Sequence, residues 1–166
     1  MDNLWAPWRQ AYIEAAKRPV EQDACFICQG LAEQDDRRNL IAWRTPSTVV
    51  LLNRFPYNNG HLLVAPLTHK GRLEELDPTE LLKIMETVRQ MVQALDHLIR
   101  PDGYNIGLNL GTVAGAGLPG HLHFHIVPRW HGDTNFVPVL ADVKVISQSL
   151  DSLYDLLVGH LQGKAS

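Results

Sequence analysis

The stretch His121-Leu122-His123-Phe124-His125-Ile126-Val127 alternates histidine with apolar residues, and this alternation decides the fold class. A β-strand has a side-chain period of two, so it would place the three histidines on one face and the apolar residues on the other. A helix would scatter the three imidazoles around its circumference. The stretch therefore predicts a strand whose apolar face enters a core, while its histidine face meets solvent, a metal or a substrate.

Four further segments are predicted to be strands, because β-branched and apolar residues in them are bounded by turn residues. The run Pro56-Tyr57-Asn58-Asn59-Gly60 is the strongest of these turn signals. Together with the histidine strand, the predicted strands are residues 39–43, 48–53, 61–66, 104–110 and 121–127.

Two segments show helical spacing instead. Apolar residues recur every three or four positions from Leu81 to Ile99. The preceding Asp77-Pro78-Thr79-Glu80 supplies an N-cap, a proline at the first helical position and an acid at the third. Similar spacing in residues 147–162 predicts a C-terminal helix. Because the strands follow one another and the helices are set apart, we predict an α+β fold with a mainly antiparallel sheet.

Composition restricts the class of protein further. The chain has 166 residues, 45% of them hydrophobic, and a formal net charge of −3. These values suit one domain with a core and exclude a disordered chain. No basic excess points to a nucleic-acid partner. The apolar runs are too short to span a membrane and the start lacks a signal-peptide pattern, so we expect a cytoplasmic protein.

Within this one domain we expect three parts. Residues 1–38 form an N-terminal arm that carries a cysteine pair, residues 39–146 form the catalytic core, and residues 147–166 form the C-terminal helix. The aromatic residues of the arm are expected to pack on the domain or on a partner subunit; they are Trp5, Trp8 and Tyr12.

Three imidazoles on one strand face indicate phosphoryl chemistry. Imidazole has an ordinary pKa near 6.5, so at pH 7 a neutral ring nitrogen can act as a nucleophile. A second imidazole can move a proton and a third can fix a tautomer. The glycine-rich residues 111–120 could present backbone N–H groups to an anion. A metal centre built from the three histidines is the competing interpretation, although no acidic residue lies among them to act as a general base.

The cysteine pair Cys25 and Cys28 allows three interpretations: a redox pair, half of a metal site, or two core cysteines. A redox pair is expected to open a helix after a strand, and no strand is predicted before Cys25. A structural zinc site would need two more nitrogen or sulfur ligands. The candidates are His69, which follows the third predicted strand, and His121.

At this point the sequence resembles a known family. Gly60-His61, the alternating His121, His123 and His125 and the following Ile-Val-Pro-Arg resemble the histidine triad (HIT) family of nucleotide hydrolases and transferases. The resemblance runs from about Cys25 to Asn135. Three stretches are similar, more narrowly, to the bacterial branch that cleaves diadenosine tetraphosphate by hydrolysis or phosphorolysis: residues 4–9, 25–28 and 128–136.

The resemblance implies roles for the triad. His123 would attack the α-phosphorus to form a covalent nucleotidyl-histidine, which water or phosphate would then release. His125 would contact the phosphoryl oxygens and assist the leaving group. His61 would complete the proton network, and His121 opens the triad strand. The implied catalytic residues are therefore His123, His125, His61 and His121.

The resemblance also implies nucleotide contacts. Asn53 matches the position where the family binds ribose hydroxyls, and Asn109 looks like the amide that contacts phosphate. Many members carry Gly-Gln-Ser/Thr-Val before the triad, and its hydroxyl helps to hold phosphate. Residues 115–120 here have no side-chain donor. Phosphate contacts would then fall to backbone amides around Gly117 and Leu118.

Zinc-containing relatives use a cysteine pair, a histidine after the third strand and the first triad histidine. The resemblance therefore implies a structural zinc ion at Cys25, Cys28, His69 and His121, and no organic cofactor. Family members usually pair as homodimers. The expected activity is cleavage of dinucleoside polyphosphates of the diadenosine tetraphosphate type. A nucleoside phosphoramidase would use the same residues, and a nucleotide-binding sensor without turnover is the non-enzymatic alternative.

Overall fold

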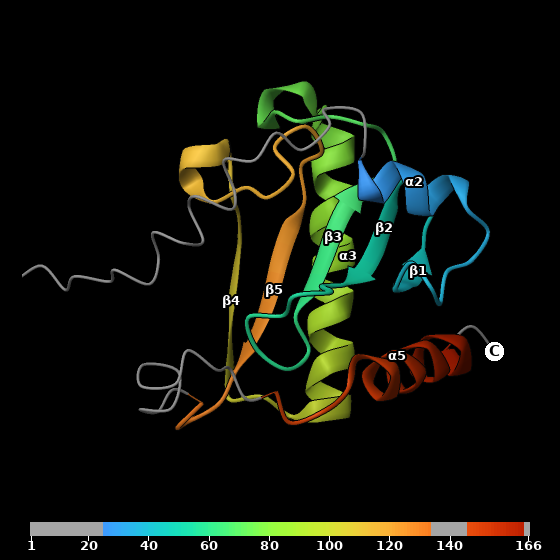
Figure 1. Ribbon diagram of the computed structural model, residues 1–166, viewed down its shortest axis with the longest axis vertical. Helices are drawn as coiled ribbons and strands as arrows, with labels where there is room; N and C mark the ends of the chain where they lie inside the picture. The colour runs from blue at the N-terminus through green and yellow to red at the C-terminus, as the bar shows by residue number, and fades with distance from the viewer. Residues whose placement is uncertain (1–24, 134–145, 165–166) are drawn as a thin grey trace, which may run out of the picture.

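Figure 1 shows the computed structural model, in which five strands form one sheet with a long helix behind it. The structure describes residues 25–133 and 146–164. The strands lie in the order β1-β2-β3-β5-β4, and every neighbouring pair is antiparallel. Their bounds are β1 Ile41–Arg44, β2 Thr48–Leu52, β3 Leu62–Pro66, β4 Gly103–Leu108 and β5 Phe124–Arg129. The predicted α+β class with an antiparallel sheet is confirmed.

The larger core lies between the sheet and two helices, α3 (Pro78–Ile99) and α5 (Leu150–Lys164). The predicted start of α3 is confirmed: the Asp77 carboxylate accepts from the N–H groups of Thr79 and Glu80, at 2.7 and 2.9 Å. The Glu80 carboxylate accepts from the Asp77 N–H in return. Residues from α3, α5 and the sheet share this core, among them Met91, Leu95, Leu157, Leu62, Val64 and Ile126.

The opposite face of the sheet is covered in part by a short helix, α2 (Phe26–Ala32). This helix lies within residues 1–38, for which the sequence predicts an arm and no helix. It has only seven residues, so its periodicity is too short to be read from the sequence. Ile27 fixes it on the sheet and is fully buried. Residues 1–24, with Trp5, Trp8 and Tyr12, lie outside the described residues.

The histidine strand begins later than predicted. β5 starts at Phe124, so His121 and His123 precede it instead of lying in it. Because Phe124 pairs with Val64, the same register would place Leu122 opposite Pro66, which has no N–H to donate to the ladder. Leu122 instead donates its N–H to the carbonyl of Lys70, at 2.6 Å. The predicted alternation holds, since the apolar residues of this stretch enter the core beside α3.

Gly60 directly precedes His61 and is the residue that its turn requires. Its φ is +77°, and an added Cβ would lie 2.6 Å from a methyl carbon of Ile99. A side chain there would be strained by the backbone and by the packing at once.

None of the helices in the described ranges is both long and apolar enough to cross a membrane. The three-part division of the chain stays a prediction.

Candidate active site and cysteine–histidine cluster

The candidate active site is centred on an imidazole pair between two neighbouring strands. His61 immediately precedes β3, and His125 lies in β5 opposite Leu63. The Nε2 atom of His61 is 2.9 Å from the Nδ1 atom of His125. The β3–β5 register therefore brings together two histidines that are 64 positions apart in the chain.

A backbone N–H fixes the tautomers of this pair. The N–H of Tyr57 donates to Nδ1 of His61, at 3.0 Å. Because that nitrogen accepts, neutral His61 carries its proton on Nε2 and donates it to Nδ1 of His125. His125 then carries its own proton on Nε2. Within the described residues no hydrogen bond to this Nε2 is found, so it can donate to a substrate.

His123, in contrast, has a free lone pair with which it can attack a substrate. Its Nδ1 atom is 2.8 Å from the carbonyl oxygen of His121. A carbonyl only accepts, so Nδ1 carries the proton and Nε2 keeps a lone pair. The ring centroids of His123 and His125 are 5.0 Å apart. A nucleophilic nitrogen and a hydrogen-bond-donating nitrogen therefore belong to adjacent imidazoles.

Burial keeps both rings neutral. The pKa of His123 is lowered because burial disfavours the imidazolium, although its hydrogen bond to the backbone carbonyl opposes this. Burial and, secondly, the proximity of His123 lower the pKa of His125 to about 4. At pH 7 the two imidazoles are therefore uncharged, which leaves His123 with a nucleophilic lone pair and His125 with an N–H that can donate a hydrogen bond.

Tyr57 forms one wall of the site. Its ring centroid lies 4.6 Å from that of His61, and the ring stacks on His125 at 5.8 Å and 16°. Tyr57 is not among the predicted site residues. An aromatic residue in the turn directly before Gly60-His61 is the sequence signal that points to it.

The predicted ribose-binding residue adjoins this pair. Asn53 follows β2, and its Nδ2 atom lies 3.2 Å from Nδ1 of His61. Its side-chain carbonyl accepts from the N–H of Phe55, at 2.9 Å. The structure thus places Asn53 beside the imidazoles, on the side away from β5.

The predicted phosphate-binding residues lie around the glycine-rich loop. Leu108 pairs with Phe124, so Asn109 is one position beyond the ladder and adjoins His123 in register. Its Nδ2 atom is 3.9 Å from the place of a Cβ on Gly115. Gly117 is exposed and Leu118 is half-buried against the α2 face. The hydrogen bonds and ring contacts of the described residues do not join these last two residues to the triad.

The four predicted metal ligands come together in a second group, the cysteine–histidine cluster. The Nδ1 atom of His121 is 3.2 Å from Sγ of Cys25 and 3.5 Å from Sγ of Cys28. The Nδ1 atom of His69 is 3.2 Å from Sγ of Cys28. All four ligand atoms lie within 4.8 Å of one another.

Hydrogen bonds to backbone groups orient the side chains of this cluster. Nε2 of His121 donates to the carbonyl oxygen of Pro66, at 2.9 Å, which turns Nδ1 toward the thiols. Cys25 is the N-cap of α2, and its sulfur accepts from the N–H of Cys28 at 3.4 Å. Burial and the neighbouring Cys25 raise the pKa of Cys28 to about 11, so metal binding would have to displace a thiol proton.

The geometry fits a tetrahedral metal ion. With Zn–S near 2.3 Å and Zn–N near 2.0 Å, ligand atoms of a tetrahedral site lie roughly 3.3 to 3.8 Å apart. The observed contacts between nitrogen and sulfur are of this size. A redox pair would not need two imidazoles pointing at its sulfurs, so the donor set favours a metal over the redox interpretation.

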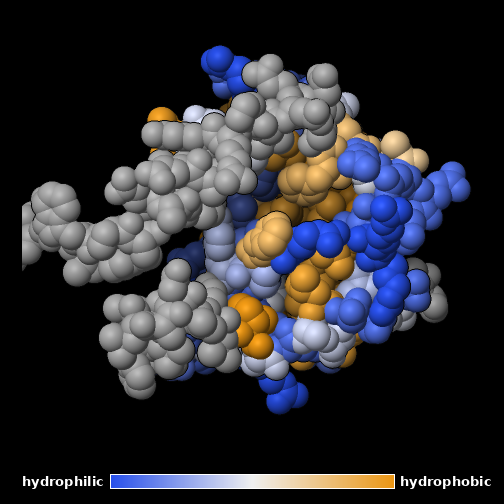
Figure 2. Space-filling model, in the orientation of Figure 1, coloured by the Kyte–Doolittle hydropathy of each residue, from blue (hydrophilic) through white to orange (hydrophobic). Residues whose placement is uncertain are grey.

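The face that carries both groups is seen in the space-filling view. Apolar side chains lie over the middle of the sheet, and hydrophilic ones gather along the side where α2 and the following turn run (Figure 2). Among the described residues, α2 packs on β1 to β3, while the imidazole pair lies between β3 and β5.

Comparison with known proteins identifies relatives. The family model described as "HIT domain" matches residues 36–132. A protein named "AP-4-A phosphorylase" from Mycobacterium tuberculosis is 37% identical over 163 residues, which cover 95% of this chain and 83% of that one. A "Bis(5'-nucleosyl)-tetraphosphatase [asymmetrical]" from Schizosaccharomyces pombe is 34% identical over 56% of this chain and 50% of its own length.

Solved structures show the same fold. A structure described as a "ZN-bound histidine triad family protein" from Mycobacterium smegmatis superposes with a TM-score of 0.67 at 21% identity, covering 87% of this chain and 99% of that one. The family model covers more than half of the chain, and the M. tuberculosis relative extends over nearly all of it. The chain belongs to the HIT family.

Proposed function

We propose that this HIT enzyme cleaves dinucleoside polyphosphates of the diadenosine tetraphosphate type through a nucleotidyl-histidine at His123. The observation that carries the proposal is the pair of fixed tautomers. His123 holds its proton on Nδ1 and exposes a lone pair on Nε2, while His125 holds its proton on Nε2. The names of the M. tuberculosis and S. pombe relatives support the substrate class.

In the first step, Nε2 of His123 forms a bond to the α-phosphorus. The bond between that phosphorus and the bridging oxygen breaks, and its electron pair leaves with the departing nucleotide. The Nε2–H of His125 donates a hydrogen bond to this oxygen and stabilises the charge that develops on it, while His125 keeps its proton because the departing phosphate is a weak base that leaves as an anion. His61, whose Nε2 donates to Nδ1 of His125, holds the ring in the orientation and tautomer that the donation needs.

In the second step, an acceptor attacks the same phosphorus and the bond to His123 breaks. Water or phosphate approaches from the side that the leaving group has vacated, the proton of an attacking water passes to solvent, and the electron pair of the broken bond returns to Nε2 of His123. This restores the neutral His123 and releases AMP from water or ADP from phosphate. Because a 37% identical relative is named a phosphorylase, we propose phosphate as the main acceptor.

The remaining predicted residues would bind the nucleotide. Asn53 would donate its amide to the ribose hydroxyls, and Asn109 would contact the phosphates beside His123. Gly117 and Leu118 would offer backbone N–H groups to phosphate oxygens, since this loop has no side-chain donor.

The cysteine–histidine cluster would hold a structural zinc ion. Cys25, Cys28, His69 and His121 form a closed set of four ligands, which leaves no position for a substrate. Zinc there would tie α2 to the segment that carries His123, because the carbonyl of His121 accepts from His123. The ion would supply rigidity and no step of the reaction.

We also propose a homodimer. β4 is at the edge of the sheet, and an exposed edge strand is a ready partner for a second copy. Apolar side chains are exposed on this strand and on α3: Ile106 on β4, and Leu82 and Met85 on α3. A symmetric pairing would cover them. The predicted cytoplasmic location stays a prediction.

Product analysis tests the function. The chain is incubated with diadenosine tetraphosphate, with and without inorganic phosphate, and the nucleotides are separated by chromatography. Phosphorolysis yields ATP and ADP only when phosphate is present, and hydrolysis yields ATP and AMP. An AMP–amine conjugate in parallel measures phosphoramidase activity. Absence of tetraphosphate cleavage, with turnover of the conjugate, would contradict the proposal.

A further inference from the structure

We infer that Arg44, held by Asp36, is a positioning residue that sets the metal affinity of the cysteine–histidine cluster. The inference rests on the proposed zinc site. Arg44 lies at the end of β1 and contacts no ligand of that site. It acts on the far end of α2, the helix that carries both thiols.

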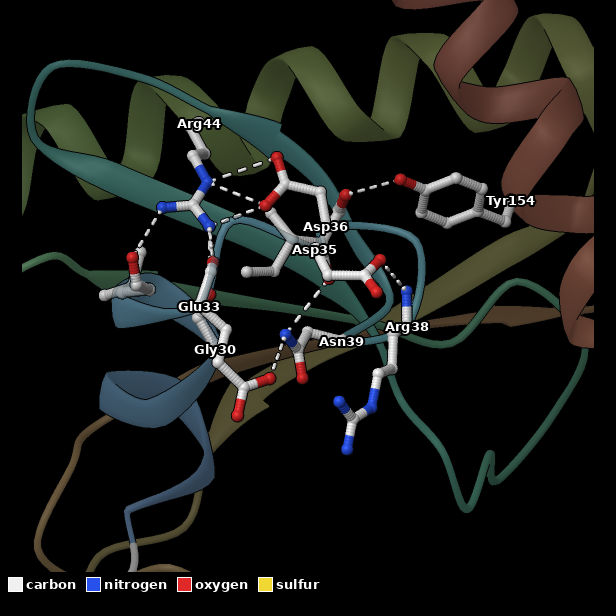
Figure 3. Close-up of polar contacts among 10 residues, drawn as sticks. Gly30, Glu33, Asp35, Asp36, Arg38, Asn39, Arg44 and Tyr154 are labelled. Carbon is white, nitrogen blue, oxygen red and sulfur yellow. Dashed lines mark hydrogen bonds and ion pairs between the residues drawn. The ribbon is translucent and has the colours of Figure 1, made fainter.

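The guanidinium of Arg44 closes the C-terminal end of α2. Its Nη2 donates to the carbonyl of Gly30 at 2.9 Å and, more weakly, to that of Glu33 at 3.4 Å. Its Nη1 donates to the carbonyl of Leu31 at 3.0 Å. Figure 3 shows this group between the end of the helix and Asp36, with dashed lines to both.

Asp36 fixes the plane of the guanidinium. Its carboxylate accepts from Nε of Arg44 at 3.0 Å and from Nη2 at 2.6 Å. A planar fork with this second support holds several carbonyls at once, which the single ammonium group of a lysine cannot do. The Arg44 side chain is only 34% exposed, so water screens these contacts less than it screens those of the open surface.

α2 needs hydrogen bonds of this kind to hold its position. A helix of seven residues is not stable alone, and its last carbonyls have no partners within the helix. Burial of Ile27 holds it against the sheet, but apolar packing has no direction. The hydrogen bonds from Arg44 have direction, so they fix the rotation of α2 about its axis and its position along it.

The position of α2 directly determines where the two thiols lie. Cys25 is the N-cap of α2 and Cys28 lies one turn further on, so a turn of the helix moves both sulfurs relative to His69 and His121. The two imidazoles come from segments outside α2, since His69 follows β3 and His121 precedes β5. A tetrahedral ion tolerates little error in ligand position, so a loosened α2 would bind it less tightly.

A matched control variant is available at Arg37, which is next to Asp36 in the turn that follows α2. Arg37 makes a two-pronged ion pair with Asp155 of α5, and this pair contacts neither α2 nor the cluster. Arg37→Gln therefore removes the same kind of interaction, an Arg–Asp fork of the same turn, without changing the support of α2. It separates a specific effect on metal binding from general destabilisation.

The experiment measures zinc affinity by competition with a chromophoric chelator in the full chain, for wild type, Arg44→Gln, Arg44→Lys and Arg37→Gln. We expect Arg44→Gln to weaken zinc binding by roughly 10- to 100-fold, the usual effect of losing an outer support of a metal site. Arg44→Lys should recover little of this, and Arg37→Gln should bind zinc as wild type does. Asp36→Asn, which leaves the carbonyl contacts in place, should weaken binding less than Arg44→Gln.

Two further readouts keep the outcomes distinct. The melting temperature of each metal-free variant reports folding alone, and the absorption band of the Co²⁺-loaded protein reports ligand geometry. Unchanged zinc affinity and an unchanged band in Arg44→Gln, beside a zinc-binding wild type, would overturn the role of Arg44 only. A wild type that binds no zinc would overturn the zinc site itself.

Discussion

The cysteine–histidine cluster and the candidate active site use the imidazole side chain for different proposed purposes. In the cluster, Nε2 of His121 is occupied by a carbonyl, and its free nitrogen converges on two sulfurs. In the active site, Nδ1 of His123 is occupied by a carbonyl, and its free nitrogen remains for a substrate. The difference indicates how the partner of the second ring nitrogen would suit one imidazole to the proposed metal ligation and the other to the proposed nucleophilic attack.

Replacing the proposed nucleophile should have the largest effect on activity and should leave the cysteine–histidine cluster unchanged. His123→Ala removes the only proposed attacking atom, so kcat should fall by roughly 10⁴-fold or more. Zinc content should stay at the wild-type level, because His123 is not a ligand. His97→Ala, at the far end of α3, serves as the control in steady-state assays. Full activity in His123→Ala would remove the proposed mechanism.

Loss of the hydrogen-bond donor beside the leaving group should cost less. His125→Gln should lower kcat on diadenosine tetraphosphate by roughly 10²- to 10³-fold, the usual effect of losing one donor that stabilises developing negative charge. An AMP ester of a phenol presents no leaving phosphate to this donor, so its turnover should fall much less. Equal losses on both substrates would mean that His125 orients the α-phosphate and does not stabilise the leaving group.

Breaking the cluster should change stability more than chemistry. Cys28→Ser leaves three ligands, and removal of a bound ion at about 100 times its Kd costs roughly 2.7 kcal/mol. For a chain of this length we expect the melting temperature to fall by about 5 to 10 °C, measured by calorimetry with zinc present. The rate at a temperature well below melting should change by less than that of His125→Gln. A melting temperature equal to that of wild type would contradict a structural metal.

The pH profile should show the smallest effect. The pKa of His125 is lowered to about 4, so the neutral ring that the mechanism needs persists as pH falls through the ordinary imidazole range and is lost only near pH 4. The pH dependence of kcat/KM reports pKa values of the free enzyme. We expect kcat/KM to begin to fall only below pH 6.5, the ordinary pKa of an imidazole. An acid midpoint at or above 6.5 would show that the reacting imidazole is not desolvated.

The sequence predicted what local rules control. The capping residues before α3 identify its start, and the alternation after residue 120 identifies the apolar face that packs beside that helix. The four cluster ligands also follow from their positions and the family resemblance. These features depend on short-range patterns that each carry their own physical reason.

Other features depend on contacts between distant segments. β5 starts at Phe124 because the opposite strand ends at a proline, and no pattern within the histidine stretch contains that information. α2 is too short for periodicity and is stabilised by Arg44, which follows it by a dozen positions. The aromatic ring of Tyr57 stands out in the turn before Gly60, but the backbone N–H by which Tyr57 fixes the tautomer of His61 has no signature in the sequence.

The stereochemistry at the α-phosphorus tests the central claim most directly. A diadenosine tetraphosphate with one α-oxygen replaced by sulfur is chiral at that phosphorus. With phosphate as the acceptor the α-thio-ADP product is chiral too, so its configuration can be assigned directly, and with water as the acceptor an oxygen-isotope label makes the assignment possible. Attack by His123 followed by attack of the acceptor inverts the centre twice, so the account predicts net retention. Net inversion would show a single direct displacement and would contradict a nucleotidyl-histidine intermediate.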